Sequence, residues 1–265
     1  MRHLEIILTC LVIFCVIFSA GCVSQNTSRE AALSDALKMI SLRLNDGAGY
    51  VREAADDIGN NNNTDAESSR QILADLYQTS TLARTILYAD KNMIVISVYP
   101  DIILSSTGTD QTSYGTNETY FAGRNITLTD YLHLDDGTNA SVLSAPVYTD
   151  GKWNGYVSMS FDSSRLFGDE EQYLSKTYGY HLLVTQTDGV QIYDYDLCER
   201  GKNMATDPVY ADGVHAAALL IMNQTSGTTG YTYQKIWSDE FVQKTAVWDT
   251  FEFGGQTWQV IILSE

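Results

Sequence analysis

The stretch NASVLSAPVYTDGKWNGYVSMSFD, residues 139–162, decides the fold because it encodes two strands and the turn between them. Asp150-Gly151 favours the tight turn of a β-hairpin, and apolar residues recur on both sides of it. The end of the chain repeats this plan, since Gly254-Gly255 turns the segment 244–265 back on itself. A Trp follows each turn, at Trp153 and Trp258, and we interpret both as core residues. The two hairpins predict an antiparallel sheet in each half of the chain.

A short sequence motif also occurs twice, once before each hairpin. GRNITLTDY at 123–131 and GKNMATDPVY at 201–210 both read Gly, a cation, Asn, an apolar residue, then Thr and Asp with a Tyr close behind. Each half also begins with an apolar strand, MIVISV at 93–98 and YHLLVT at 180–185. The shared order predicts two related α+β modules with different insertions, and chance similarity of short phrases is the alternative.

The residues before the sheets have a helical period. Between residues 27 and 58 apolar residues recur at steps of three, four and seven, and Thr27 with Glu30 forms a capping box. After a polar loop, Thr64 with Glu67 opens a second helix that is predicted to reach about residue 88. The sequence therefore predicts the α+β class, with an N-terminal helical stalk followed by two antiparallel-sheet lobes.

The first residues form a leader rather than part of the fold. A basic residue precedes an apolar run from Ile6 to Phe18, which suits a signal peptide and is short for a membrane span. Ser19-Ala20-Gly21 before Cys22 resembles a lipobox, with Ser19 in place of the usual large apolar residue. We predict a signal peptide at residues 1–21 and a lipid on Cys22, and an uncleaved signal anchor is the alternative. Both interpretations place the remainder outside the cytoplasm.

The composition excludes several partners. With 33 acidic and 16 basic residues the net charge is −17, which argues against nucleic acid and against an anionic membrane surface. Once Cys10 and Cys15 leave with the leader and Cys22 carries lipid, only Cys198 remains, so no disulfide framework is predicted. An intermolecular disulfide at Cys198 is the alternative to a plain core or loop residue. Six glycosylation sequons agree with an external protein, at Asn26, Asn62, Asn117, Asn125, Asn139 and Asn223.

Motifs of catalysis and of metal binding are not found in the sequence. His133, His181 and His215 follow no metal-ligand spacing, and there is no nucleophile elbow, P-loop or dinucleotide fingerprint. The acidic stretches 135–139 and 194–199 offer oxygen atoms that suit Ca²⁺, but neither fills a ligand loop, and we interpret both as solvated turns. The sequence predicts no enzyme, no metal site and no cofactor.

The segment 144–166 resembles the double Cache family, the tandem PAS-like extracellular sensors of chemoreceptors and sensor kinases. In that family a Pro-led strand turns through Asp-Gly and returns as Gly and two apolar residues into an acidic residue. The positions that match are Pro146, Gly151, Gly155 and Asp162. The stretch 188–210 is similar to the strand, loop and Gly-Lys-Asn passage of the family's membrane-proximal lobe, and the resemblance covers about residues 27–265.

The resemblance implies N-terminal helices at 22–88, a membrane-distal PAS-like lobe at 89–168 and a membrane-proximal one at 169–265, and the predicted lipid on Cys22 anchors the helices. It also implies that the distal lobe binds the ligand, between its sheet and the helix and loops above it. The candidate ligand-binding residues are Tyr99, Asp101, Tyr120, Arg124, Tyr131, Tyr148 and Asp162. Ser158 and Ser160 share a strand face that either lines this pocket or faces solvent.

Alternatives stay open at two of these candidates. Arg124 suits a ligand carboxylate, but its counterpart in the second phrase is Lys202, so a structural cation is the alternative. Asp162 suits a ligand amine or the cap of the next helix. The motif that marks amino-acid-binding members, an Arg followed closely by Trp-Tyr, is not legible here, so amino-acid recognition is not predicted.

These observations favour a lipid-anchored extracellular protein that binds a small polar molecule reversibly and has no output domain of its own. The expected partners are the membrane, through the lipid, a separate signalling membrane protein, and a second copy paired through the N-terminal helix. The alternative is a cell-envelope structural or adhesion protein with degenerate pockets. An open first-lobe cavity with convergent polar groups favours the first hypothesis, and a filled one favours the second.

Overall fold

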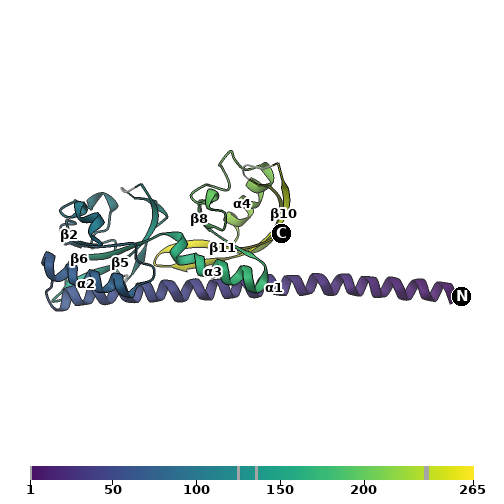
Figure 1. Ribbon diagram of the computed structural model, residues 1–265, viewed down its shortest axis with the longest axis horizontal. Helices are drawn as coiled ribbons and strands as arrows, with labels where there is room; N and C mark the ends of the chain where they lie inside the picture. The colour runs from purple at the N-terminus through teal and green to yellow at the C-terminus, as the bar shows by residue number, and fades with distance from the viewer. Residues whose placement is uncertain (1, 124–125, 135–136, 236–238) are drawn as a thin grey trace.

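A long helix, α1 (Arg2–Asn60), lies along one side of the molecule, and two sheet lobes follow one another along it (Figure 1). The computed structural model describes residues 2–123, 126–134, 137–235 and 239–265, with the backbone alone for residues 2–27 and Leu104. The predicted start at Thr27 is wrong, because the helix continues through residues 2–26, which contain no proline. No helix among the residues searched in the structure is long and apolar enough to cross a membrane.

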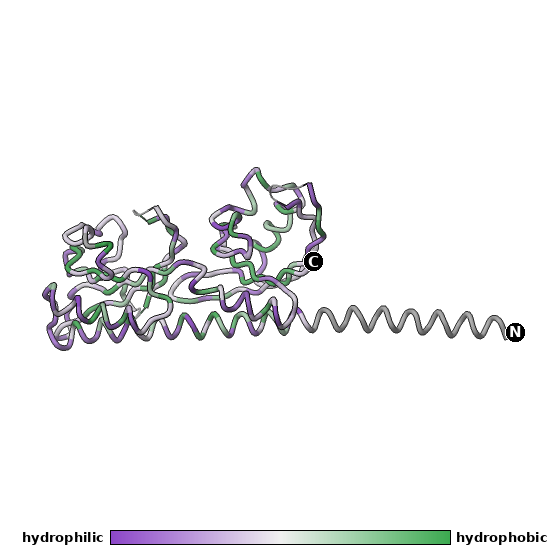
Figure 2. The backbone as a smooth tube through the Cα atoms, viewed as in Figure 1, coloured by the Kyte–Doolittle hydropathy of each residue, from purple (hydrophilic) through white to green (hydrophobic). Residues whose placement is uncertain are grey.

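Helix α1 is the spine of the fold because one stripe of it is buried against both lobes. Ile40, Leu44, Val51 and Ile58 are fully buried at helical spacing, and hydrophobic and hydrophilic residues alternate along the part of the helix that lies against the lobes in Figure 2. The same core cluster continues into Met159 of the first lobe and Trp258 of the second. The two lobes therefore share one core through α1.

The second helix, α2 (Ala66–Thr79), is shorter than predicted. The carboxylate of Asp65 accepts the backbone N–H groups of Glu67 and Ser68 at 3.0 and 2.9 Å, so Asp65 rather than Thr64 is the cap. The predicted extension to residue 88 is wrong, because residues 85–90 alternate between buried and half-buried positions and pair as a strand.

The first lobe is an antiparallel sheet in the order β2-β1-β6-β5-β3, with β4 paired to β5. Its strands are β1 (Thr85–Asp90), β2 (Val95–Tyr99), β3 (Thr127–Leu128), β4 (Leu132–His133), β5 (Asn139–Thr149) and β6 (Lys152–Phe161). Two 3-10 turns, η1 (Asp101–Ser106) and η2 (Thr112–Tyr114), follow β2. The predicted turn of the β5–β6 hairpin is confirmed, since Asp150 and Gly151 adopt φ of 51° and 72°.

The second lobe repeats this topology in the order β8-β7-β11-β10-β9. Its strands are β7 (His181–Gln186), β8 (Gln191–Asp194), β9 (Ser226–Gln234), β10 (Phe241–Phe253) and β11 (Gln256–Ser264). Helix α3 (Ser163–Tyr178) joins the lobes, and η3 (Leu197–Glu199) and α4 (Asp212–Asn223) follow β8.

The predicted α+β chain of two related lobes is confirmed by the matching strand orders. One detail of that prediction is wrong, because MIVISV supplies the second strand of its lobe, β2, and not the first. The first strand is β1, in the segment that the sequence assigned to a helix.

Candidate functional site

The first-lobe sheet presents opposite chemistry on its two faces. On β6, Val157, Met159 and Phe161 are buried in the core that includes α1. Ser158 and Ser160 alternate with them and therefore point to the other face, where they line a cavity. One face of β6 thus packs in the hydrophobic core, and the other face forms the floor of the cavity.

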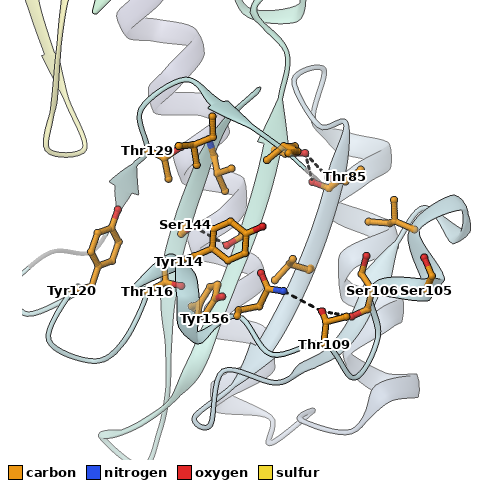
Figure 3. Close-up of a pocket in the computed structure, with 18 residues that line it drawn as sticks. Thr85, Ser105, Ser106, Thr109, Tyr114, Thr116, Tyr120, Thr129, Ser144 and Tyr156 are labelled. Carbon is orange, nitrogen blue, oxygen red and sulfur yellow. Dashed lines mark hydrogen bonds between the residues drawn. The ribbon is translucent and has the colours of Figure 1, made fainter. Parts of the chain in front are cut away.

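The cavity lies between this polar face and the segment that follows β2, and Figure 3 shows its side chains converging on it. Its volume is about 280 Å³, just below the usual range of about 300–1,000 Å³ for ligand pockets. The hydroxyl-bearing residues that line it are Thr85, Ser105, Ser106, Thr109, Tyr114, Thr116, Tyr120, Thr129, Ser144, Tyr156, Ser158 and Ser160. The other lining residues are Leu87, Ile103, Gln111, Leu132, Leu134 and Val142.

The floor is built from hydroxyl pairs on neighbouring strands. Ser144 on β5 and Ser158 on β6 are cross-strand partners, and their hydroxyl oxygens lie 2.8 Å apart. Thr85 on β1 and Ser160 on β6 form a second hydroxyl pair. The Ser144–Ser158 pair uses one donor and one lone pair, so it keeps one hydrogen and further lone pairs for a ligand. In the other pair the Ser160 hydroxyl also donates to the backbone oxygen of Thr85 at 3.4 Å, so this pair offers lone pairs. The floor can therefore both donate and accept hydrogen bonds.

Neutral groups form the rest of the described wall. The Gln111 amide donates to the Thr109 hydroxyl at 3.1 Å, and Thr109 donates to the backbone oxygen of Ser106 at 2.7 Å. Burial raises the pKa of Tyr156, which keeps that phenol un-ionised at neutral pH. Among the described lining residues none carries a charged side chain.

The structure places only some of the predicted residues at this cavity. Tyr120, Ser158 and Ser160 line it. Tyr99 lies instead against Tyr77 of α2, with ring centroids 5.0 Å apart, and Asp101 forms an ion pair with Arg70 of the same helix. Tyr99 and Asp101 therefore serve the packing of α2.

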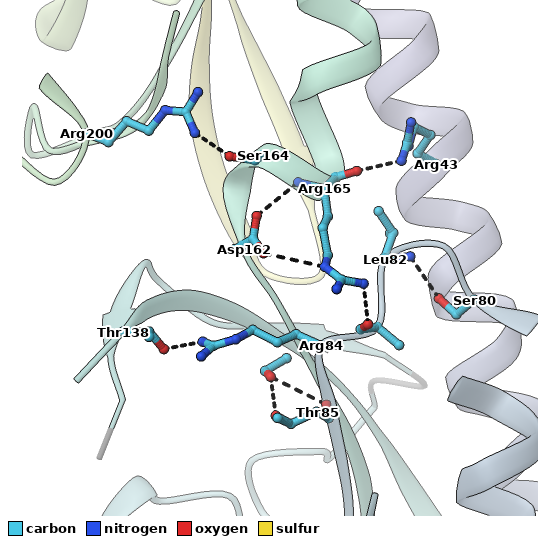
Figure 4. A network of polar contacts seen from close by, with 12 residues as sticks. Arg43, Ser80, Leu82, Arg84, Thr85, Thr138, Asp162, Ser164, Arg165 and Arg200 are labelled. Carbon is cyan, nitrogen blue, oxygen red and sulfur yellow. Dashed lines mark hydrogen bonds and ion pairs between the residues drawn. The ribbon is translucent and has the colours of Figure 1, made fainter. Parts of the chain in front are cut away.

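The remaining described candidates also lie away from the cavity lining. The backbone N–H of Tyr131 donates to the side chain of Gln186 in the second lobe. Tyr148 is 42% exposed and meets Trp153 edge-on, with ring centroids 6.3 Å apart. Asp162 caps α3, where it accepts the Arg165 N–H at 3.1 Å (Figure 4). Arg124 and the side chain of Cys22 lie outside the described residues.

Asp162 belongs to a polar joint between α1, the first sheet and the second lobe (Figure 4). The Arg165 guanidinium pairs with Asp162 at 3.5 Å and donates to the backbone oxygen of Ala83 at 2.7 Å. From the other side, Arg43 of α1 donates to the backbone oxygen of Arg165. Of the two roles considered for Asp162, helix capping is the one these contacts show.

Sequence reasoning missed most of the cavity wall, because Tyr114, Thr116 and Gln111 come from the irregular segment between β2 and β3. Such a segment has no period from which the direction of a side chain can be predicted. The position of Ser144 at the cavity could have been predicted, because it pairs with Ser158 across the predicted hairpin.

In the second lobe the equivalent sheet face is covered by a helix and carries both apolar and charged residues, since Asp194 pairs directly with Leu183 and Lys244 lies two residues before Ala246 on β10. Leu183, Ile261 and Leu263 occupy the positions where the first-lobe sheet has Leu87, Ser158 and Ser160. They pack in one cluster with Trp248 and with the buried residues of α4, which are Val214, Ala217, Ala218 and Ile221. A whole helix covers this face, whereas short turns cover its first-lobe counterpart.

The second lobe also buries a charged cluster, so the interpretation of 194–199 as a solvated turn is wrong for two of its acidic residues. Asp194 is 3% exposed and Glu199 is 6% exposed. Glu199 accepts hydrogen bonds from the phenols of Tyr210, at 3.0 Å, and Tyr233. Lys244, 5% exposed, lies 4.0 Å from the centre of the Tyr233 ring. These partners explain how the carboxylates are buried.

Metal or thiol chemistry has little support in the part of the chain that the structure describes. No cluster of three or more His, Cys, Asp or Glu residues there has the arrangement of a metal site. Cys198 lies exposed in η3 with a free thiol. The cavity of the first lobe is accordingly the site we consider further.

The sequence matches no known protein-family model and no curated protein. Its structure is similar to an extracellular ligand binding receptor from Desulfohalobium retbaense, with a TM-score of 0.72 and 19% identity over 89% of this chain. This chain spans 40% of the length of that receptor.

Two chemoreceptor domains are also similar in structure. The ligand binding domain of the Pseudomonas aeruginosa amino acid chemoreceptor PctB, in complex with L-Gln, has a TM-score of 0.64 and 10% identity, over 89% of this chain and 88% of its own. That of the Pseudomonas fluorescens chemoreceptor CtaA, in complex with L-isoleucine, has a TM-score of 0.62 and 12% identity, over 91% and 92%. The chain therefore has the double Cache fold of extracellular sensor domains.

Proposed function

We propose that this protein is an extracellular sensory protein that binds a small molecule reversibly in the cavity of its first lobe. The observation that carries the proposal is the contrast between the lobes. On equivalent sheet faces, the first lobe has a cavity lined by hydroxyls, whereas apolar residues of the second lobe pack with α4 in one buried cluster. A cavity that only served packing would be filled, because unfilled space costs stability.

The proposal includes an anchor and partners. The protein is held at the outer surface by a lipid on Cys22, as the leader sequence predicts. It passes the binding event to a separate signalling membrane protein and pairs with a second copy through α1. Similar chemoreceptor domains form complexes with L-Gln, L-isoleucine and GABA, which supports a ligand-binding role without identifying the ligand of this chain.

A thermal-shift screen of the purified protein against amino acids, amines, carboxylates, polyols, sugars and nucleobases tests this function. Ligand that binds only the folded state stabilises it by about 2.7 kcal/mol at 100 times the dissociation constant, so a hit raises the melting temperature. If no compound in the screen shifts a well-folded protein, the sensory role fails and the structural or adhesion role is favoured.

A matched pair of variants then locates the site. Tyr120 lines the cavity and Tyr148 does not, although both lie in the first lobe. Tyr120→Phe removes one hydroxyl from the wall and should lower the affinity for a compound found in the screen about two- to tenfold, the range for one lost hydrogen bond. Tyr148→Phe should leave the affinity unchanged. Equal effects of the two substitutions would place the site elsewhere.

A further inference from the structure

We propose that the first-lobe cavity selects a neutral, hydroxyl-bearing small molecule of monosaccharide size or below, such as a polyol or a simple sugar. The inference rests on the proposed function, because it names the ligand class of that same site. This ligand class differs from the ligands in the similar chemoreceptor complexes, which are amino acids and GABA.

Hydrogen-bonding capacity is the first reason. Two thirds of the described lining residues carry a hydroxyl, and the floor hydroxyls of Ser144, Ser158, Thr85 and Ser160 already lie in pairs. A hydroxyl is donor and acceptor at once and rotates to suit its partner. Such a surface complements ligand hydroxyls, which have the same dual character. A ligand with only acceptors, or only donors, would leave half of this capacity unused.

Charge is the second reason. A carboxylate or ammonium that leaves water for a cavity needs a partner of opposite charge, because desolvation of an unpaired ion costs several kcal/mol. Among the described residues the cavity lining has no such partner. Two charged residues that are close in sequence to lining residues have contacts of their own. Arg84 donates to Thr138, and the Asp110 carboxylate accepts the Thr112 N–H at 2.8 Å.

Two further groups of charged residues in the described structure are paired away from this cavity. Asp101, two residues after the end of β2, forms an ion pair with Arg70 of α2. Asp194, Glu199 and Lys244 are buried together in the second lobe. Neither group lines the first-lobe cavity.

Aromatic and aliphatic surface is the third reason. Tyr114, Tyr120 and Tyr156 contribute rings as well as hydroxyls, and Leu87 and Val142 lie among the floor hydroxyls. Polyols and sugars carry C–H groups between their hydroxyls, so they suit a wall that alternates polar and apolar groups. The cavity volume of about 280 Å³ limits the ligand to a small molecule.

Isothermal titration of the purified full-length protein in detergent tests the inference with two matched sets of probes. The neutral set is erythritol, ribose, glucose and myo-inositol, and the charged set is L-glutamine, L-isoleucine and GABA. We expect at least one neutral probe to bind and no charged probe to bind. The dissociation constant of the neutral probe should change less than twofold between 50 and 500 mM NaCl, since no ion pair forms.

A cavity-filling variant ties the binding to this site. Ser158→Leu places a larger apolar side chain on the floor and should raise the dissociation constant of the neutral probe at least 100-fold. Ser175→Leu, at an exposed position of α3, is the control and should leave binding unchanged. Circular dichroism checks that both variants fold. If Ser158→Leu does not fold, Ser144→Ala, which removes one floor hydroxyl, should weaken binding about two- to tenfold.

The outcomes separate this inference from the proposed function. If a charged probe binds and Ser158→Leu abolishes its binding, the sensory function stands and the neutral-ligand inference is overturned. If a neutral probe binds equally well to Ser158→Leu, the assignment to this cavity is overturned. If neither set binds, the inference fails, and the thermal-shift screen described above then tests the proposed function.

Discussion

Replacement of Gly59 by Ala tests the packing of α1 against the first lobe most directly. Gly59 lies in the last turn of α1, and a Cβ built there would be 2.2 Å from the backbone oxygen of Tyr148 and 3.1 Å from its carbonyl carbon. Because the obstacle is backbone at the end of β5, no side chain can rotate away to relieve the contact. Either α1 or the β5–β6 hairpin must move.

The magnitude follows from two opposing effects. Ala is better than Gly in a helix by about 1 kcal/mol, which favours the variant. Overpacking in a well-packed region costs about 1–3 kcal/mol, and a backbone obstacle puts this site at the upper end. We therefore expect Gly59→Ala to lose about 1–2 kcal/mol of unfolding free energy.

Gly49→Ala is the matched control, because it makes the same change in the same helix at a position where a Cβ would meet no atom within 4 Å. It should gain up to about 1 kcal/mol. The two variants should thus differ by about 1–3 kcal/mol, or roughly 2–12 °C in melting temperature for a chain of this size. Urea denaturation and thermal melts measure both quantities. A Gly59→Ala protein as stable as Gly49→Ala would refute the packing of α1 on Tyr148 that the structure shows.

Three further predictions concern stability. Burial, and next the Glu199 charge, raises the pKa of Asp194 to about 7 from an ordinary 3.8, so the folded state binds this proton more tightly than the unfolded chain. The contribution of Asp194 to stability should be full below about pH 4 and be lost as the pH rises through about 7. Asp194→Asn should flatten that slope in melts between pH 5 and 7.5. Asp162→Ala should cost about 1 kcal/mol by urea denaturation through loss of the α3 cap, whereas Asp162→Asn, which can still cap, should not. Leu143→Ala, at a fully buried core position, should cost about 2–5 kcal/mol, and a cost below 1 kcal/mol would contradict its place in the core.

The fold was predictable where local patterns and long-range structure agree. Asp150-Gly151 and Gly254-Gly255 specify their turns through positive φ, and the alternation around them specifies the strands. The segment 85–90 was not predictable in this way. Its residues TILYAD are compatible with a helix that continues α2, and only pairing with β6, far along the chain, selects a strand.

The site was predictable on its floor and not on its walls. Ser158 and Ser160 are polar residues that alternate with apolar ones in a strand, and that period alone assigns them to one face. Whether that face meets solvent or a cavity depends on the segment folded over it. Tyr148 shows the limit of the pattern, because it shares a strand face with Ser144 and yet lies near the hairpin turn, outside the cavity lining. Sequence periodicity gives the face of a side chain and not how far a cavity extends along the strand.

Hydrogen bonds from backbone N–H groups join a segment of the cavity wall to the second lobe. Thr129 lines the cavity, and the neighbouring Leu128 N–H donates to the backbone oxygen of Gly254 at 2.9 Å, at the tip of the last hairpin. The N–H of Tyr131 donates to Gln186 at the end of β7. A ligand that displaced Thr129 would therefore strain two hydrogen bonds that cross between the lobes. Both lobes also pack on α1, so a shift between them acts on the one element that leads toward the N-terminus. The short segment 127–131 thus contacts both the cavity and the second lobe.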